Sequence, residues 1–233
     1  MLADQINNEI KNLADPELAV HHLRFFKTGK GEYAEGDLFY GLRVPDVRKI
    51  AKKYFKTIDL SEIDVLIKNP YHEVRLAAII MLILKYRKAD SEGQKKIYNL
   101  YLSNVDYINN WDLIDISAYA IVGAFLFNKN TEKLWELAKS GHLWSERISV
   151  LATLYFIKYG EYTHSIELAK HFLNHKHDLM HKATGWILRE VGKKDINVLY
   201  AFLDQFHKVM PRTMLRYSLE KLSEEKRIIY MKK

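Results

Sequence analysis

The sequence predicts an all-α protein, and three of its features support this prediction. Apolar residues recur every three or four positions along nearly the whole chain, as they do on the buried face of a helix. No segment shows the sustained alternation of apolar and polar residues that is typical of a half-buried strand. The predicted helices also come in pairs that repeat at similar intervals. We therefore expect a right-handed α-solenoid of HEAT-like or armadillo-like repeats, with residues 1–233 forming one domain.

The composition narrows the class of protein. Of the 233 residues, 48% are hydrophobic and 28% are charged, which is usual for a globular chain and argues against disorder. The absence of Cys excludes a disulfide framework, a Cys-ligated zinc and an iron–sulfur cluster. The longest apolar run, Leu76 to Leu84, is too short to cross a bilayer, and the N-terminus does not resemble a signal peptide. The net charge of +7 favours nucleic acid or another anionic surface as the partner.

Proline, capping residues and apolar periodicity predict where each helix begins and ends. Pro16 and Pro45 suit the first turn of a helix, and Asn69-Pro70 form a cap and first-turn pair. Ser91 and Gln94 have the spacing of a capping box. In chain order the predicted helices are 4–13, 16–27, 46–55, 61–67, 71–87, 91–102, a central helix that begins within 109–115, then 131–139, 145–158, 163–174, 178–192, 195–207, 211–222 and a last one from 223.

One Gly-rich segment, residues 29–41, interrupts this succession. As a connector, it would use Gly where the backbone needs a positive φ. As a phosphate-binding loop, it would need the spacing and the Ser or Thr of a P-loop, both of which Gly29-Lys30-Gly31 lacks. The sequence therefore favours a connector here.

The second helices of successive pairs align on one charged position. Their first turns place Arg75, Asp115, Arg147, Lys182 and Arg216 in register, at intervals of 40, 32, 35 and 34 residues. Second helices line the concave face of a HEAT-like stack, so we expect these five side chains to form a column there. Four regularly spaced cations suit a polyanion such as DNA. A carboxylate repels phosphate, so Asp115 is expected to meet something positive.

Two tryptophans accompany the charged column. Trp111 lies four residues before Asp115 and Trp186 lies four residues after Lys182, so each shares a helix face with a column residue. One interpretation is that both indoles belong to the core and that the acids near residue 112 only complement the helix dipole. The other is that two indoles bracket one carboxylate, since indole faces attract cations. The cation column favours the second interpretation.

Four segments resemble the AlkD family of bacterial DNA-alkylation repair glycosylases. They are residues 25–33, 41–45, 110–115 and 181–190, and the most specific parts are W-D-x-x-D and G-W-x-L-R-E. The resemblance implies a HEAT-like enzyme that removes N3- and N7-alkylated purines from duplex DNA in base-excision repair. It implies that Asp115 is catalytic and that Trp111 and Trp186 are aromatic clamps. The DNA-binding candidates are Arg147, Lys182, Arg75, Arg216 and Arg189. The Gly-rich insertion and Phe25, where some members have Tyr, depart from the family pattern.

The chemistry can be argued without the resemblance. Alkylation at N3 or N7 leaves a purine positively charged, so the base is already a good leaving group. One ionised Asp could then stabilise the cationic sugar or orient the attacking water, with both indoles holding the sugar in place. Because no Lys is placed next to Asp115 to form a Schiff base, we expect a monofunctional hydrolase. We expect no cofactor and no metal. Metal binding by His171, His175, His177 and His181 is disfavoured against phosphate contact or solvation, since the segment lacks Cys.

Two other classes of function are compatible with parts of this pattern. A non-catalytic HEAT-like protein that binds branched or damaged DNA would explain the charge and the column, but it would not need Asp115. A protein-binding solenoid would explain the repeats alone. For the glycosylase we expect double-stranded DNA containing alkylated purines as the partner, no membrane, a monomeric state, and a place in the bacterial cytosol near the nucleoid.

Overall fold

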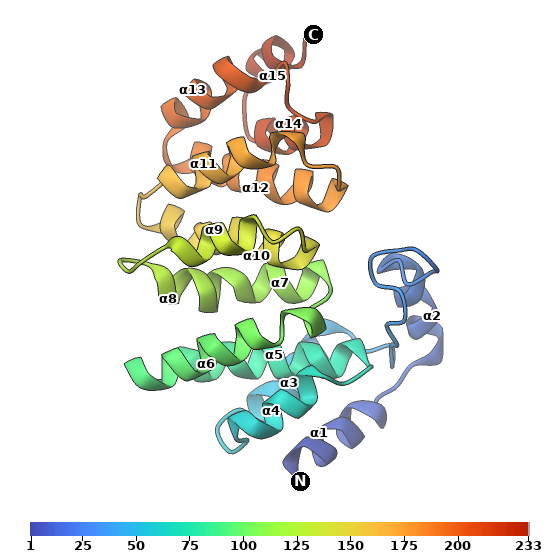
Figure 1. Cartoon of the computed structure of the whole chain (residues 1–233). Helices are drawn as coiled ribbons and strands as arrows, with labels where there is room; N and C mark the ends of the chain where they lie inside the picture. The colour runs from blue at the N-terminus through green and yellow to red at the C-terminus, as the bar shows by residue number, and fades with distance from the viewer. Residues whose placement is uncertain (233) are drawn as a thin grey trace. The chain divides into compact units, whose positions relative to one another are not determined.

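The computed structural model describes residues 1–232 and confirms the all-α class. Over these residues the only β-pairing is one isolated bridge between Leu38 and Tyr71. No helix in the described part of the chain is long and apolar enough to cross a membrane. The chain divides into two compact units, Met1–Ser117 and the part that begins at Ala118 (Figure 1). That residues 1–233 form a single repeat domain stays a prediction.

The first unit is organised around one buried helix. Its α-helices are α1 (Leu2–Lys11), α2 (Pro16–Phe25), α3 (Val44–Tyr54), α4 (Leu60–Ile67), α5 (His72–Tyr86), α6 (Ser91–Ser103) and α7 (Trp111–Ser117), with a 3-10 turn η1 (Val105–Tyr107) before α7. Beyond its first turn helix α5 is almost entirely apolar, and nearly every residue of it is buried, as expected for a helix covered from several directions. Helices α1, α3, α4, α6 and α7 all pack against it.

The second unit repeats the same design. It contains the π-helix η2 (Ala118–Gly123), α8 (Ala124–Leu126), α9 (Glu132–Ala138), α10 (Leu143–Lys158), α11 (Thr163–His171), the 3-10 turn η3 (Phe172–Asn174), α12 (Asp178–Lys194), α13 (Ile196–Phe206), α14 (Arg212–Leu219) and α15 (Glu224–Met231). Helix α10 is the buried centre and packs against η2, α9, α11 and α12. Helices α12 and α14 pack so closely that a Cβ on Gly185 would lie 2.5 Å from the carbonyl oxygen of Met214.

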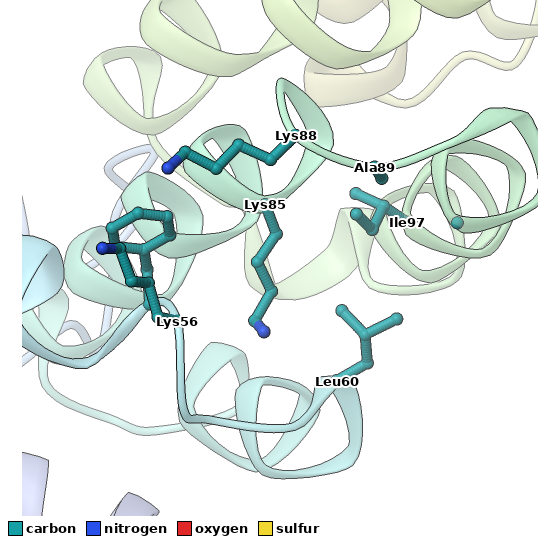
Figure 2. A pocket seen from close by; sticks show the side chains of 8 residues that line it. Lys56, Leu60, Lys85, Lys88, Ala89 and Ile97 are labelled. Carbon is teal, nitrogen blue, oxygen red and sulfur yellow. The ribbon is translucent and has the colours of Figure 1, made fainter.

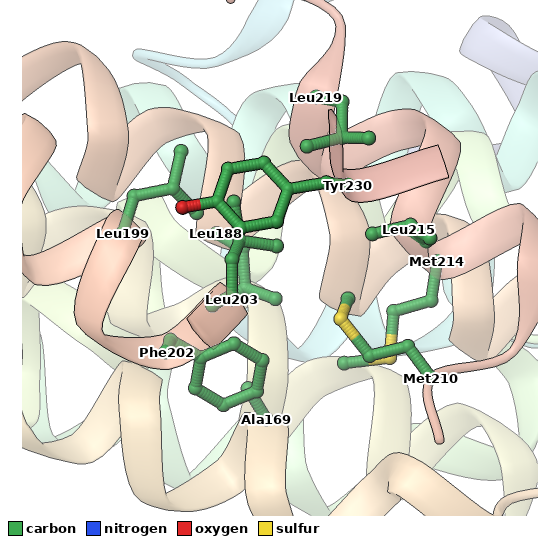
Figure 3. Packing of buried hydrophobic residues seen from close by; sticks show 10 residues of the cluster. All are labelled: Ala169, Leu188, Leu199, Phe202, Leu203, Met210, Met214, Leu215, Leu219 and Tyr230. Atoms are coloured by element: carbon green, nitrogen blue, oxygen red, sulfur yellow. The ribbon is translucent and has the colours of Figure 1, made fainter. Parts of the chain in front are cut away.

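A separate apolar cluster closes the C-terminal end of this unit (Figure 3). Side chains from α12, α13 and α14 meet there with Tyr230 of α15. Tyr230 is 6% exposed, and its hydroxyl donates a hydrogen bond to Asp204 Oδ1 at 2.8 Å. The apolar members are Ala169, Leu188, Leu199, Phe202, Leu203, Met210, Met214, Leu215 and Leu219. The last helix therefore contributes Tyr230 to the cover of this apolar cluster.

The predicted helix positions agree closely with the structure, but two predicted caps are wrong. Helix α6 is capped by Asp90, whose carboxylate accepts the N–H of Gly93, and not by a capping box at Ser91. Asn69 accepts the N–H of Tyr71 in the turn before α5, so it orders the approach to the helix and does not cap it. The π-helix η2 was not predicted, because apolar spacing does not distinguish a π turn from an α turn.

The Gly-rich segment is a connector that folds onto the N-terminal end of α5. Gly31, Gly36 and Gly41 have φ values of 78°, 86° and 87°, as a tightly turning connector requires. Its return to α5 is fixed by Glu73, which is 2% exposed. The Glu73 carboxylate accepts backbone N–H groups from residues 40, 41 and 42 at 3.0, 2.8 and 3.1 Å. One buried acid on α5 therefore holds the end of the connector.

Replacing Glu73 by Ala is expected to lower the free energy of unfolding by about 3 kcal/mol or more, because three backbone N–H groups lose their acceptor in a buried place. Thermal unfolding followed by circular dichroism measures the loss. The matched control is Glu92→Ala on α6, whose carboxylate pairs with Lys96 and is 75% exposed. Such a surface pair contributes about 0–1 kcal/mol. Equal losses for the two variants would contradict the anchoring role of Glu73.

Candidate active site

The sequence places the two most specific candidates on the first turns of α7, and the structure shows why a helix begins there. Asn110 is fully buried and its side-chain oxygen accepts the N–H of Trp111 at 2.8 Å. Leu113 and Ile114 are also fully buried and turn one face of α7 into the core. Trp111 and Asp115, one turn apart, are consequently left partly exposed on another face.

Trp111 lies on a wall of aromatic rings contributed by the end of α2. Its indole stacks on Phe26, with ring centroids 5.6 Å apart and an angle of 27°, and meets the edge of Phe25 at 5.9 Å. Phe26 is buried, whereas Phe25 is 55% exposed. The interpretation of Trp111 as a core residue is therefore wrong: it is the partly exposed front of a stack whose back is in the core.

A buried histidine stands behind this wall. The His72 ring stacks on Phe39 and lies against Phe26, with both centroid distances 4.9 Å. Its Nε2 is 2.8 Å from Asp112 Oδ2, and its Nδ1 is 3.7 Å from Asp37 Oδ2. Asp112 directly follows Trp111, so the histidine is linked to the start of α7 by both its polar and its apolar surfaces.

The charges around His72 determine its protonation. Burial alone would lower the pKa of His72, but the charge of Asp112 and the interactions with Asp112 and Asp37 outweigh it and raise the pKa to about 9. Burial would likewise raise the pKa of Asp37, yet His72, Arg75 and Asn109 together lower it. At neutral pH the group is therefore a buried imidazolium and guanidinium facing two carboxylates.

Arg75 belongs to this buried group, and this corrects its predicted role. Its side chain is 4% exposed, Nη2 lies 2.7 Å from Asp37 Oδ2, and Nη1 donates to the carbonyl oxygens of residues 69 and 70 at 2.9 and 3.1 Å. A guanidinium held in this way cannot reach a DNA phosphate without breaking buried interactions that stabilise the first unit. Arg75 is a structural cation of the first unit.

The other predicted site residues lie in the second unit. Trp186 on α12 is partly exposed, and its Nε1 donates to Glu190 Oε1 at 3.1 Å, so it too is not a core residue. Lys182 pairs with Asp178 one turn earlier at 2.9 Å and is 41% exposed. Arg216 on α14 is exposed. The exposed surfaces of Lys182 and Arg216 are accessible to a phosphate, and their contact with DNA stays a prediction.

Arg147 and Arg189 are more constrained. Arg147 is 4% exposed, and its Nη1 donates to the carbonyl oxygen of Leu179 at 2.6 Å within the same unit. Arg189 interacts with the carboxylates of Glu190 and Glu220 and is 17% exposed. A phosphate would have to compete with those two acids for Arg189, so Lys182 and Arg216 are the better probes of DNA contact.

The histidine-rich segment is used for local structure. The Nδ1 atoms of His175 and His177 accept the N–H groups of His177 and Leu179, and His181 Nε2 lies 2.6 Å from the carbonyl oxygen of His175. His175 Nε2 is 2.9 Å from Glu146 Oε2. These bonds order the turn that leads into α12. In the part of the chain that the structure describes, no group of three His, Cys, Asp or Glu is arranged to hold a metal.

The sequence did not reveal that His72, Asp37 and Asp112 act together. They lie 35 and 40 residues apart, and no periodicity connects a loop residue with residues on two helices. The one available signal is local: His72 stands three positions before the aligned Arg75, at the start of a helix that is apolar beyond its first turn, where a buried His needs a polar partner. This signal does not identify the residues that pair with His72.

A hollow of about 430 Å³ lies at the opposite end of α5 from His72 (Figure 2). Its floor is apolar, with Phe55, Leu60 and Ile97 among its lining residues. Lys56, Lys85 and Lys88 surround it. No acid, His or hydroxyl side chain is among the lining residues, so the hollow lacks the groups that hydrolysis of a glycosidic bond requires.

Comparison with known proteins places the chain in a family. The family model described as DNA alkylation repair enzyme matches residues 6–222. The chain belongs to the DNA alkylation repair enzyme family. A solved structure described as a predicted DNA alkylation repair enzyme from Enterococcus faecalis has a TM-score of 0.71 and 16% identity, covering 91% of this chain and 97% of that one. At this identity it shows a shared fold. No curated protein matches the chain.

Membership in the DNA alkylation repair enzyme family confirms the resemblance seen in the sequence and assigns the protein to the repair of alkylated DNA. The matched range covers most of each unit and all of the predicted site residues. DNA is accordingly the partner, in agreement with the nucleic acid or other anionic surface that the net charge of +7 favours.

Proposed function

We propose that the protein is a monofunctional DNA glycosylase that excises cationic N3- and N7-alkylated purines, such as 3-methyladenine and 7-methylguanine, from duplex DNA. The observation that carries this proposal is the pairing of Asp115 with Trp111 on one partly exposed face of α7, in a member of a DNA alkylation repair family. A carboxylate next to an aromatic surface suits a positively charged sugar better than a phosphate. Trp186 of the second unit is proposed as the other aromatic contact with the DNA.

The proposed reaction requires only a few side chains of the protein. The C1′–N bond of the alkylated nucleotide breaks, its electron pair goes to the base, and the base leaves neutral because it began with a positive charge. The sugar is left with oxocarbenium character, which the Asp115 carboxylate stabilises while water adds to C1′ and releases a proton. Trp111, supported by Phe26, would hold the deoxyribose against Asp115. The product is an abasic site in an intact strand.

The decisive experiment is base release from a methylated duplex. Incubation of the protein with the duplex, followed by chromatography of the released bases, should yield 7-methylguanine and 3-methyladenine at rates above those of spontaneous loss. The DNA strand should remain unbroken until it is heated in alkali. Strand cleavage by the protein itself would contradict the monofunctional mechanism, and the absence of any base release would contradict the glycosylase.

DNA contact by the second unit can be tested separately. Lys182→Ala and Arg216→Ala should each weaken binding to any duplex and reduce the dependence of log Kd on log salt by about one phosphate contact. These two are chosen because Arg147 and Arg75 are buried, and their loss would also destabilise the protein. The control is Arg87→Ala, an exposed cation at the C-terminal end of α5. Equal salt slopes for the three variants would contradict the assignment.

A non-catalytic DNA-binding protein of the same fold is the second candidate. It would retain the salt-dependent binding of Lys182 and Arg216 but release no base from any duplex. The partly exposed face that carries Asp115 favours the glycosylase, since a carboxylate weakens binding to phosphate. Under the first proposal the protein acts as a monomer on chromosomal DNA in the cytosol, and sedimentation of the free protein tests the monomeric state.

A further inference from the structure

We propose that His72 is a positioning residue for the candidate site: clamped between Asp37 and Asp112, it fixes the first turn of α7 and the aromatic support of Trp111. Its effect on base release rests on the proposed function. Its effect on Trp111 does not, and can be measured without DNA. All the residues involved belong to the first unit.

The polar contacts of His72 reach both sides of Trp111. Asp112 Oδ2 lies 2.8 Å from His72 Nε2, while Asp112 Oδ1 accepts the N–H of Leu113 at 2.9 Å. On the other side, Asp37 Oδ1 accepts the side-chain N–H of Asn109 at 3.0 Å, and Asp37 Oδ2 is 3.7 Å from His72 Nδ1. The two carboxylates therefore link one imidazolium to Asn109, two residues before Trp111, and to Asp112, which directly follows it.

The apolar contacts of His72 reach Trp111 from behind. The imidazolium lies against Phe26 and Phe39, and Phe26 in turn stacks on the indole of Trp111. Phe26 and Phe39 also stack on each other at 5.1 Å. A cation close to aromatic rings is attracted by their faces, and more strongly when water is excluded. The rings that support Trp111 are thus held by the same charged group that holds its backbone.

This arrangement depends on the proton. With His72 charged, two cations, His72 and Arg75, face the two carboxylates of Asp37 and Asp112. A neutral imidazole has one N–H, so one carboxylate would face a lone pair, and the buried group would carry an excess negative charge. The other ionisable groups nearby are Glu73 on α5 and His22 on α2, which lie 3.6 Å from each other. Glu73 accepts three backbone N–H groups of the connector, and burial lowers the pKa of His22, so His22 does not supply a second imidazolium.

The pH dependence has a definite sign. The pKa of His72 is raised from 6.5 to about 9 in the folded protein. Its contribution to stability is fully present below pH 6.5 and is lost as the pH rises through 9. Positioning of Trp111 should follow the same course, because it requires the same proton. The side chain of Trp111 should therefore lose its fixed position above neutral pH.

The test uses the full-length protein labelled with 5-fluorotryptophan, with the Trp111 signal assigned by comparison with Trp111→Phe. In the unsubstituted protein the ¹⁹F signal of Trp111 should titrate with a midpoint near 9, and single-turnover base release should fall with the same midpoint. Asp112→Asn should move both midpoints toward 6.5, because it removes the largest charge that raises the pKa. His72→Gln should abolish the titration and lower base release at neutral pH by about tenfold or more, which is about 1.4 kcal/mol of barrier.

The matched control is His21→Gln. His21 is an exposed imidazole of α2 that stacks on Phe25 but makes no contact with Asp37 or Asp112. In this variant the Trp111 signal and base release should keep their alkaline midpoint. The rate of base release should stay within about twofold of that of the unsubstituted protein, well short of the tenfold decrease that about 1.4 kcal/mol of barrier gives. A loss of stability alone would lower the melting temperature of His72→Gln, but it would not make two independent midpoints move together in Asp112→Asn.

Two results would contradict the positioning role of His72. The proposal is overturned if base release by His72→Gln still falls with a midpoint near pH 9. It is also overturned if the Trp111 signal of the unsubstituted protein does not titrate. If His72→Gln does not fold, the titrations of the unsubstituted protein and of Asp112→Asn still decide. If no variant releases any base, the proposed function fails, while the Trp111 titration continues to test the positioning by itself.

Discussion

Replacing Asp115 by Asn is expected to lower the single-turnover rate of base release by about 10²-fold or more, which corresponds to a rise of about 3 kcal/mol in the barrier. The substitution keeps the size of the side chain and removes the negative charge that would face the cationic sugar. Duplex affinity should stay equal or increase, because a carboxylate that repels phosphate is lost. The measurement is release of 7-methylguanine from a duplex with one modified position, together with binding of the same duplex.

The control for this prediction is Asp106→Asn. Asp106 is an exposed acid of η1, in the turn that precedes α7, so its replacement changes the net charge by the same amount at a position outside α7. It should release base at the rate of the unsubstituted protein. Near-normal release by Asp115→Asn would remove Asp115 from the mechanism. A fall in both rate and duplex affinity would instead indicate a structural role.

Neutral bases are expected to be released at least about 10³-fold more slowly than 7-methylguanine from the same duplex, a difference of about 4 kcal/mol in barrier. A neutral base such as hypoxanthine or uracil would leave as an anion unless an acid protonates it. His72, behind the aromatic wall of Trp111, is buried, and its ring nitrogens lie 2.8 Å from Asp112 and 3.7 Å from Asp37. His181 already bonds to the carbonyl oxygen of His175. Neither is placed to protonate a departing base.

This prediction is checked with three duplexes that differ only in the central base: 7-methylguanine, hypoxanthine and uracil. Single-turnover release is followed by chromatography, with a duplex that lacks enzyme as the blank. The matched variant is His181→Ala, which should leave all three rates unchanged. Release of hypoxanthine within tenfold of 7-methylguanine would show that the protein supplies an acid, and a loss of that release in His181→Ala would identify it.

Most of the fold could be predicted from the sequence because the helices are defined by local apolar spacing. Helix α11 begins at Thr163 and α12 at Asp178, as expected, and most other ends fall within a few residues. One of the two wrong caps arises where two capping residues stand side by side, as Asp90 and Ser91 do. Local spacing does not choose between such neighbours, because the choice depends on how the preceding turn packs.

The candidate site, too, could be predicted only in part from the sequence. A motif of six residues was enough to single out Trp111 and Asp115, because their spacing of four places them on one helix face whatever the rest of the chain does. Their partial exposure, and that of Trp186, required the structure. That all of these residues act on alkylated DNA stays a proposal that base release will decide.

Arg75 shows what only the tertiary structure could determine. The repeat register correctly places it in the aligned first turn of α5, but the register says nothing about which other segment covers that turn. The connector between α2 and α3 folds back onto α5, is anchored there by Glu73, and brings Asp37 to within 2.7 Å of the guanidinium. Periodicity determines the face on which a side chain lies, because a helix is a local structure. Burial, charge pairing and the protonation of His72 depend on a loop distant in sequence, and only the folded chain brings that loop into contact.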